Sequence, residues 1–232
     1  MDLSVPRQLP LSLPLRDSST LDSFVTTPGS SVQAAVHRLL EAPGQVYVWG
    51  AAGTGRSHLQ EAAVRQALAR GQRACLLSAP EMLATDVALL EGLEQQHCLA
   101  IDDIDILAGR ADWEEGLFHL YNRLMANGCS FLCSASLPPA AAGFALADLA
   151  SRLAAGPVYQ LEQLDDDARA ELLIRRAASR GLELGQEVAN FIALRAPRTN
   201  SALLSCLEQL DRAAWEYKRR LTLPFVKETL GW

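Results

Sequence analysis

The sequence predicts an α/β fold in which a five-stranded parallel sheet, flanked by helices, is followed by a small all-helical unit. Short apolar runs alternate with segments of helical spacing as far as residue 161, which is typical of a parallel sheet covered by helices. After Asp165 only helical spacing continues. A Gly-rich loop, Gly50 to His58, joins the first apolar run to a helix, as a phosphate-binding loop does.

Each expected element follows from a local pattern. Apolar runs predict strands at residues 45–49, 74–78, 98–102, 131–134 and 158–161. Helical spacing predicts helices at residues 30–41, with Ser30 or Ser31 as the cap, 56–70, 86–95 and 112–126, and then at 165–180, 185–195, 199–219 and 222–230. Gly181 and Gly185 mark the first junction within the second set.

Composition and these elements divide the chain into three parts. Residues 1–20 are rich in Pro, Ser and Leu without periodicity, which is typical of a flexible arm. With 232 residues, 49% of them hydrophobic, the chain is long enough for one sizeable core and a smaller unit. We expect a nucleotide-binding core at residues 21–163 and a helical domain at residues 164–232.

The charge balance argues against one broad class of function. With 21 basic and 27 acidic residues and a net charge of −6, the chain is unsuited to holding nucleic acid on a broad positive surface. The basic run Lys218-Arg219-Arg220 could touch phosphates, but such a run is more often a solvated helix face. We therefore expect no strong direct DNA binding.

Other compositional features predict the compartment and the state of the thiols. No apolar run is long enough for a membrane span or a secretory signal, so we expect a cytoplasmic protein that does not engage membranes. Five cysteines lie mostly within apolar runs and predict buried free thiols. The four histidines lack the spacing of a protein-built metal site.

The Gly-rich loop is the strongest functional motif. Glycines at 50, 53 and 55 permit backbone conformations that bring successive N–H groups onto a polyphosphate at the positive end of a helix. Ser57 would place a hydroxyl on Mg²⁺. The residues expected to contact nucleotide are Gly50, Gly53, Thr54, Gly55, Arg56, Ser57 and His58.

Arg56 stands where a phosphate-binding loop normally has lysine. Its planar guanidinium keeps the positive charge, but it suits bidentate gripping better than following a γ-phosphate through its transition state. We therefore expect retained nucleotide binding with poor intrinsic hydrolysis.

Clustered carboxylates end the predicted strand at 98–102. In an open α/β sheet ligands bind outside the carboxyl ends of the strands, so Asp102 is the expected Mg²⁺ holder and Asp103 could orient an attacking water. The pair could also be a solvated turn. Together with the upstream loop it predicts a nucleoside triphosphatase-type core.

Five segments together resemble a known family. They are the loop end Gly-Arg-Ser-His at 55–58, Ile-Asp-Asp-Ile at 101–104, Leu-Tyr-Asn-Arg at 120–123, Leu-Ala-Ser-Arg-Leu at 149–153 and Leu-Thr-Leu-Pro-Phe-Val-Lys-Glu at 221–228. The chain thus resembles the DnaA regulatory inactivators, AAA+ relatives of the bacterial replication initiator DnaA. This resemblance implies an AAA+ core with a helical lid. It also implies that the initiator's carboxy-terminal DNA-binding helices have no counterpart after Trp232.

The resemblance implies two partners. Family members dock on the DNA-loaded sliding clamp, the β subunit of DNA polymerase III, and then stimulate hydrolysis of ATP held by DnaA. The clamp-binding peptide would comprise Gln8, Leu9, Leu11 and Leu13, whose alternating leucines suit an extended segment in a groove. A second frame, Leu11 to Leu15, matches the family's trailing residues better but puts Pro10 in place of its glutamine.

Arg152 matches the family's arginine finger, which acts across an interface on the partner's nucleotide. The alternative is a local pair with Asp148 one turn earlier. Phe24 lies where the family packs the base, although it could simply belong to the core.

Two positions depart from the family pattern. Ser136 stands where an aspartate usually senses the γ-phosphate, and Ser201 replaces the lid arginine, with Arg198 as the only nearby substitute. ADP, ATP and an empty site stay open, with ADP favoured and Mg²⁺ optional.

Three classes of function stay open. They are a regulator that activates the ATPase of DnaA, a stand-alone AAA+ ATPase, and a DNA-associated initiator or helicase-loader relative. A homo-oligomer is compatible with each.

Overall fold

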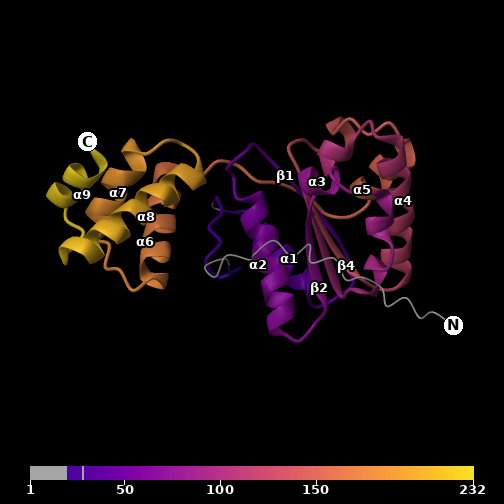
Figure 1. The fold of residues 1–232 in the computed structure, drawn as a ribbon, viewed down its shortest axis with the longest axis horizontal. Helices are drawn as coiled ribbons and strands as arrows, with labels where there is room; N and C mark the ends of the chain where they lie inside the picture. The colour runs from indigo at the N-terminus through magenta and orange to yellow at the C-terminus, as the bar shows by residue number, and fades with distance from the viewer. Residues whose placement is uncertain (1–19, 28) are drawn as a thin grey trace.

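The computed structural model describes residues 20–27 and 29–232, and in these ranges it has a mixed core and a helical lid (Figure 1). Five parallel strands form one sheet in the order β2-β3-β4-β1-β5. The strands are β1 (Gly44–Trp49), β2 (Ala74–Ser78), β3 (Cys98–Asp102), β4 (Ser130–Ala135) and β5 (Val158–Gln160). The predicted α/β class and the five-stranded parallel sheet are confirmed.

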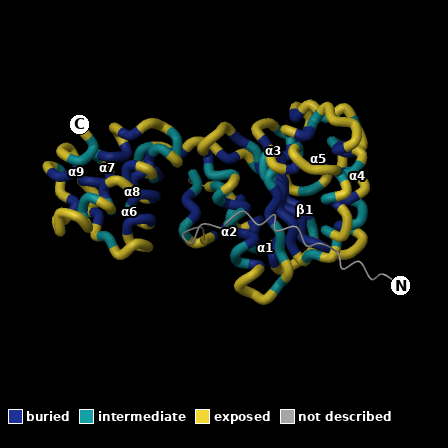
Figure 2. Tube along the Cα trace, viewed as in Figure 1, coloured by how far each residue is buried: buried dark blue, intermediate teal, exposed yellow. Residues whose placement is uncertain are grey.

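Helices cover both faces of the sheet because successive strand residues point to opposite sides. On one face Val46 and Val48 join the cluster of α1 (Val32–Leu39) and α2 (Arg56–Ala69). On the other face Tyr47 joins the cluster of the remaining core helices. These are α3 (Ala79–Met82), α4 (Ala111–Ala126) and α5 (Ala147–Ala154). Figure 2 shows the middle of the sheet buried between the two layers, whereas the edge strand β5 is partly exposed.

The parallel register places the expected functional loops at one edge of the sheet. Strand β1 pairs with β4 along its whole length, from Gly44 opposite Ser130 to Trp49 opposite Ala135. On β2, Ser78 lies opposite Asp102, the last residue of β3. The chain therefore leaves β1, β3 and β4 at the same edge, where the loop after Trp49 meets the carboxylates after Ile101.

One predicted helix is wrong. Residues 86–95 form two short 3₁₀-helices, Val87–Leu90 and Leu93–Gln95, instead of one α-helix. Between them Gly92 adopts φ +78°, a left-handed conformation that interrupts helical hydrogen bonding. The apolar spacing that suggested a helix instead lets Leu90 pack against the core.

The lid consists of four helices within the described ranges: α6 (Asp166–Ser179), α7 (Gln186–Arg195), α8 (Asn200–Tyr217) and α9 (Leu223–Leu230). Their apolar faces form a separate buried cluster that includes Leu173, Ile192, Leu207 and Phe225. All four lie within two residues of the predicted helices. The division at residue 163 stays a prediction, and it falls in the segment between β5 and α6.

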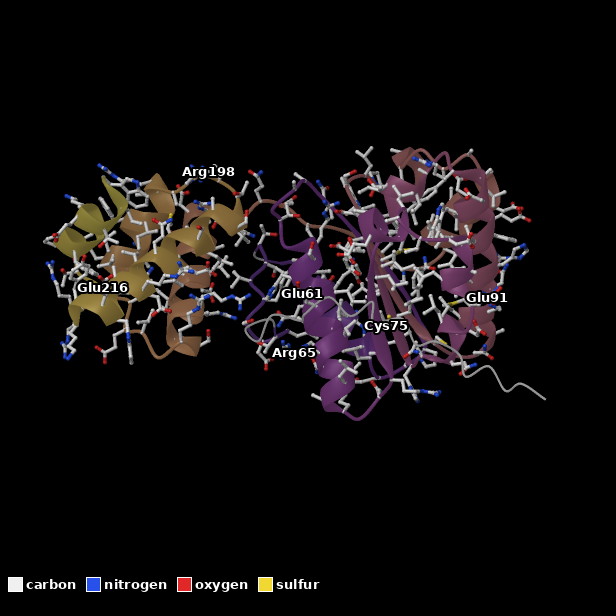
Figure 3. All side chains as sticks on the ribbon, in the orientation of Figure 1. Glu61, Arg65, Cys75, Glu91, Arg198 and Glu216 are labelled. Carbon is white, nitrogen blue, oxygen red and sulfur yellow. The ribbon has the colours of Figure 1, made fainter. Side chains whose placement is uncertain are left out.

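The five cysteines are free thiols, four of them buried and Cys75, which is labelled in Figure 3, half-buried. Burial raises the pKa of Cys98 to about 12, so its thiol stays protonated and unreactive at neutral pH. Among residues 20–27 and 29–232, no helix has the length and apolarity needed to cross a bilayer.

Candidate nucleotide-binding site

The loop between β1 and α2 has the backbone conformation that its glycines predict. Gly53 and Gly55 adopt φ +82° and +103°, which L side chains rarely tolerate. At Gly50 an added Cβ would lie 2.3 Å from the carbonyl oxygen of Leu161, so a side chain cannot fit there. The glycines therefore let the loop turn tightly and pack against Leu161, the residue after β5.

The amino end of α2 is arranged to receive an anion. Its N-cap, Gly55, provides no side-chain cap, so the first N–H groups of the helix lack that partner. Thr54 is buried and its hydroxyl donates to the carbonyl of Ala51 at 2.9 Å, which holds the loop closed. Ser57 is exposed beside these N–H groups. The uncapped helix end and exposed hydroxyl fit a Mg²⁺-bound polyphosphate.

Arg56 is held by the carboxylate of Asp103. Its Nη2 lies 2.9 Å from Asp103 Oδ1, and the arginine side chain is only 10% exposed. Its other terminal nitrogen, Nη1, is buried and has no hydrogen-bond partner among the described residues. A buried N–H without an acceptor is unfavourable, so phosphate oxygen would fit this nitrogen. Arg56 thus binds Asp103 through Nη2, and its Nη1 is available for a ligand.

The carboxylates after β3 are organised by β4 and α2. Ser134 of β4 donates its hydroxyl to Asp102 Oδ1 and accepts the N–H of Asp103 at 3.0 Å. Gln60 of α2 donates to the same Asp102 oxygen at 3.2 Å. Burial, followed by the neighbouring Asp102, raises the pKa of Asp103, while Arg56 opposes the rise. Ser134 and Gln60 carry no local sequence signal for this role, because only their burial distinguishes them from surface polar residues.

Ser136, the predicted sensor position, lies directly after β4 at the same sheet edge. Its N–H donates to Asp105 Oδ2 at 3.0 Å, and its hydroxyl donates to the same oxygen. The serine is therefore tied to the carboxylate cluster. Its hydroxyl has no charge to offer a phosphate.

Phe24 and His58 form a stacked pair beside the loop. Their ring centroids are 5.7 Å apart at an interplanar angle of 12°, and Phe24 is buried. Arg176, a lid residue on α6, donates from Nη2 to Nδ1 of His58 at 2.8 Å. Arg176 could not be singled out from the sequence, since an arginine within an amphipathic helix normally faces solvent. The lid is thus bound to the residue that follows the Gly-Arg-Ser motif.

A second lid contact lies on the loop itself. The N–H of Asn200, the first residue of α8, donates to the carbonyl of Gly53 at 3.3 Å. Thr199 packs so closely that a Cβ on Gly53 would lie 3.0 Å from its own Cβ. Next to it Ser201 is exposed, and Arg198, which is labelled in Figure 3, pairs with Asp166 of α6. The loop therefore contacts backbone and small side chains of the lid.

Arg152 lies on α5, at the other end of β1 from the loop. Gln45 near the start of β1 donates to the backbone carbonyl of Arg152 at 3.0 Å, and Gln45 and Gly50 are about 16 Å apart along an extended strand. The Arg152 side chain is exposed and forms no ion pair with Asp148 or any other residue in the described ranges. Its guanidinium is therefore available to contact a group outside this chain's own phosphate loop.

The fold and the loop geometry define an AAA+ core with a helical lid. Residues 15–160 match the family model of the bacterial DnaA ATPase domain, and residues 166–230 match that of the Hda lid domain. The chain therefore belongs to the bacterial DnaA ATPase family, and its lid is of the Hda type. The predicted resemblance is confirmed.

Solved structures agree on the fold. Domain III of the replication initiation protein DnaA from Thermotoga maritima is 23% identical with a TM-score of 0.79, over 94% of this chain and 98% of that chain. AMPPCP-bound DnaA from Aquifex aeolicus is 22% identical with a TM-score of 0.73, over 88% and 68%. The Thermotoga maritima RuvB Holliday junction branch migration motor is 19% identical with a TM-score of 0.70, over 94% and 72%. At these identities the likeness shows the fold alone.

Proposed function

We propose that this chain regulates replication initiation by stimulating hydrolysis of ATP bound to DnaA, with Arg152 acting in trans as an arginine finger. The observation that carries the proposal is the contrast between two arginines. Arg56, in the loop, is engaged by Asp103, whereas Arg152 is exposed and unpaired among the described residues. A free guanidinium can stabilise negative charge on a phosphoryl group that a neighbour holds.

The position of Arg152 favours action on a partner over action on the chain's own nucleotide. Its helix, α5, packs on the sheet face away from α1 and α2, and in Figure 1 it lies on the opposite side of the core from the lid. Its backbone is fixed at the amino end of β1, whereas the phosphate loop follows the carboxyl end. An interface between subunits is the arrangement that would bring Arg152 to a phosphate.

The chain's own site would hold an adenine nucleotide, preferably ADP, with the loop N–H groups, Arg56 and Ser57 around the phosphates. Asp102 and Ser57 would hold Mg²⁺, which would neutralise phosphate charge. Asp103 grips Arg56, and Ser136 and Ser201 carry no charge. These features support binding with slow intrinsic turnover.

Docking on the sliding clamp is proposed through Gln8, Leu9, Leu11 and Leu13, which lie outside the described residues. Support comes from the family membership and the glutamine-leucine pattern. Clamp docking would raise the effective concentration of the chain next to DnaA on DNA.

Replacing Asp103 with asparagine is expected to tighten ADP binding on the order of tenfold, because a carboxylate that competes for Arg56 and repels phosphate is removed. The raised pKa of Asp103 means that it takes up a proton at a higher pH than an ordinary aspartate. Wild-type affinity should therefore rise as pH falls through that pKa, and Asp103→Asn should lose this component. Calorimetric titration with ADP measures both effects. Asp167→Asn, which removes an exposed carboxylate, is the control and should bind ADP as wild type does. Equal or weaker ADP binding by Asp103→Asn would show that Asp103 does not compete with phosphate for Arg56.

The proposed function is tested by reconstitution. ATP-loaded DnaA, the clamp on DNA and the purified chain are combined, and ATP hydrolysis is followed with each component omitted in turn. We expect hydrolysis only in the complete mixture, and little turnover by the chain alone. Rapid turnover by the isolated chain would instead support the stand-alone ATPase.

A further inference from the structure

We propose that Glu114 and Gln45 are positioning residues that hold the two ends of α5 and thereby aim Arg152. This inference rests on the proposed role of Arg152. Neither residue belongs to the phosphate loop or to the carboxylate cluster. Both are buried polar side chains that form hydrogen bonds with the backbone at one end of α5.

Glu114 holds the amino end of α5. It lies on α4 and is 1% exposed, and its Oε2 accepts the N–H of Leu146, the N-cap of α5, at 2.6 Å. Its Oε1 accepts the N–H groups of Ala145 at 3.0 Å and Gly109 at 2.6 Å. Leu146 provides no side-chain cap of its own. A buried carboxylate from another helix therefore does the capping, with its charge next to the positive end of α5.

Gln45 holds the carboxyl end of α5. Its amide nitrogen, Nε2, donates to the carbonyl of Arg152 at 3.0 Å and to that of Leu153 at 2.7 Å. These carbonyls lie in the last turn of the helix, beyond the reach of the regular helical hydrogen bonds, and the Arg152 carbonyl also accepts the N–H of Ala155 at 3.1 Å. The chain then folds over the same side chain, since a Cβ on Gly156 would lie 2.7 Å from Cγ of Gln45. The bond to the Arg152 carbonyl fixes the backbone of the proposed finger itself.

The helix between these anchors is too short to orient itself. Its eight residues span about 12 Å, and a helix of this length is not stable alone in water. Leu149 and Leu153 are buried and hold one face of α5 to the core. The two leucines determine which face of α5 is buried, whereas Glu114 and Gln45 at its two ends determine how the helix is oriented on the core. A misplacement of about 1 Å in a catalytic group can lower a rate on the order of 10²-fold.

A positioning role and a purely structural role predict different kinetics. If Arg152 is wrongly oriented, the maximal stimulated rate falls even when the variant saturates DnaA. A loss of folded protein leaves the same maximum and only raises the concentration needed to reach it. Titrating each variant against a fixed amount of ATP-loaded DnaA on clamp-bound DNA separates the two.

The variants are Glu114→Gln, which cannot accept the N–H groups at both oxygens, and Gln45→Met, which keeps the volume but cannot donate. We expect the maximal stimulated rate to fall roughly 10-fold to 10²-fold in each. The half-saturating concentration and clamp binding should stay within about twofold of wild type. Matched controls are Glu94→Gln, whose carboxylate pairs with Arg123, and Gln66→Met on α2, and both should match wild type.

Each outcome decides the inference. It is overturned if both variants keep the wild-type maximum, or if they raise only the half-saturating concentration. If Glu114→Gln fails to fold, Gln45→Met alone decides. Arg152→Ala is measured in parallel, and an undiminished rate in that variant rejects the proposed finger and this inference together. A lost rate in Arg152→Ala with unaffected anchor variants rejects only the positioning role.

Discussion

Arg152→Ala is expected to lower the stimulated rate of ATP hydrolysis on DnaA on the order of 10³-fold or more, while the chain stays folded. An arginine finger that is fully used contributes 10³ to 10⁵ in rate, because it places positive charge where the transition state is most negative. The fold should not change, since the side chain is exposed and forms no ion pair within the described ranges. Surface substitutions of this kind usually change stability by less than about 0.5 kcal/mol.

The measurement is single-turnover hydrolysis of DnaA-bound ATP, together with clamp binding and thermal unfolding of the variant. Arg212→Ala, which removes an equally exposed arginine from α8 of the lid, is the matched control and should leave the rate unchanged. A rate within twofold of wild type for Arg152→Ala would refute the finger. Equal losses of rate in Arg152→Ala and Arg212→Ala would indicate that the overall positive charge of the surface matters, and not the position of Arg152.

Arg169→Met is expected to destabilise the lid by at least about 3 kcal/mol, the largest stability effect that we predict. Arg169 lies on α6 and is fully buried. Its guanidinium donates to the carbonyls of Ala193 at 3.2 Å, Ala196 at 3.0 Å and Pro197 at 2.9 Å. Methionine fills similar volume but leaves these three acceptors without a donor. Each bond to a charged group contributes about 1.5–3 kcal/mol.

Two of the carbonyls held by Arg169, those of Ala196 and Pro197, lie shortly before Thr199 and Asn200, the lid residues that contact Gly53 of the loop. Arg169→Met should therefore also weaken ADP binding. Urea unfolding measures the stability, and Arg212→Met supplies an exposed control of the same size change. An unchanged unfolding midpoint would show that the buried arginine contributes nothing net, as can happen when an apolar residue replaces a buried charge.

Periodicity and loop chemistry were sufficient to predict most of the fold. All five strands were predicted within two residues of their ends, because apolar runs bounded by turn residues are local signals. The phosphate loop was also predicted, since its glycine spacing follows from the tight turn itself. The stretch 86–95 failed because apolar spacing does not reveal that Gly92 adopts a left-handed conformation.

Contacts between distant residues could not be predicted. Arg56 and Asp103 were each singled out for phosphate chemistry, but nothing local indicates that they bind each other. Glu114 and Arg169 lie on helices, where a charged residue is normally assigned to the solvated face. These side chains are buried because the fold places backbone N–H or carbonyl groups beside them, which a local sequence pattern does not show. Buried charges with backbone partners are therefore the class of residue that sequence patterns miss.

In the function proposed here, this chain supplies an arginine to chemistry on its partner's nucleotide. The most direct measurement is the reconstituted reaction run twice, once with γ-labelled ATP bound only to DnaA and once with it bound only to this chain. We predict rapid release of labelled phosphate in the first reaction, dependent on the clamp and on Arg152, and little in the second. Rapid release in the second reaction would show that this chain hydrolyses its own ATP, and none in the first would show that Arg152 does not act on the nucleotide of DnaA.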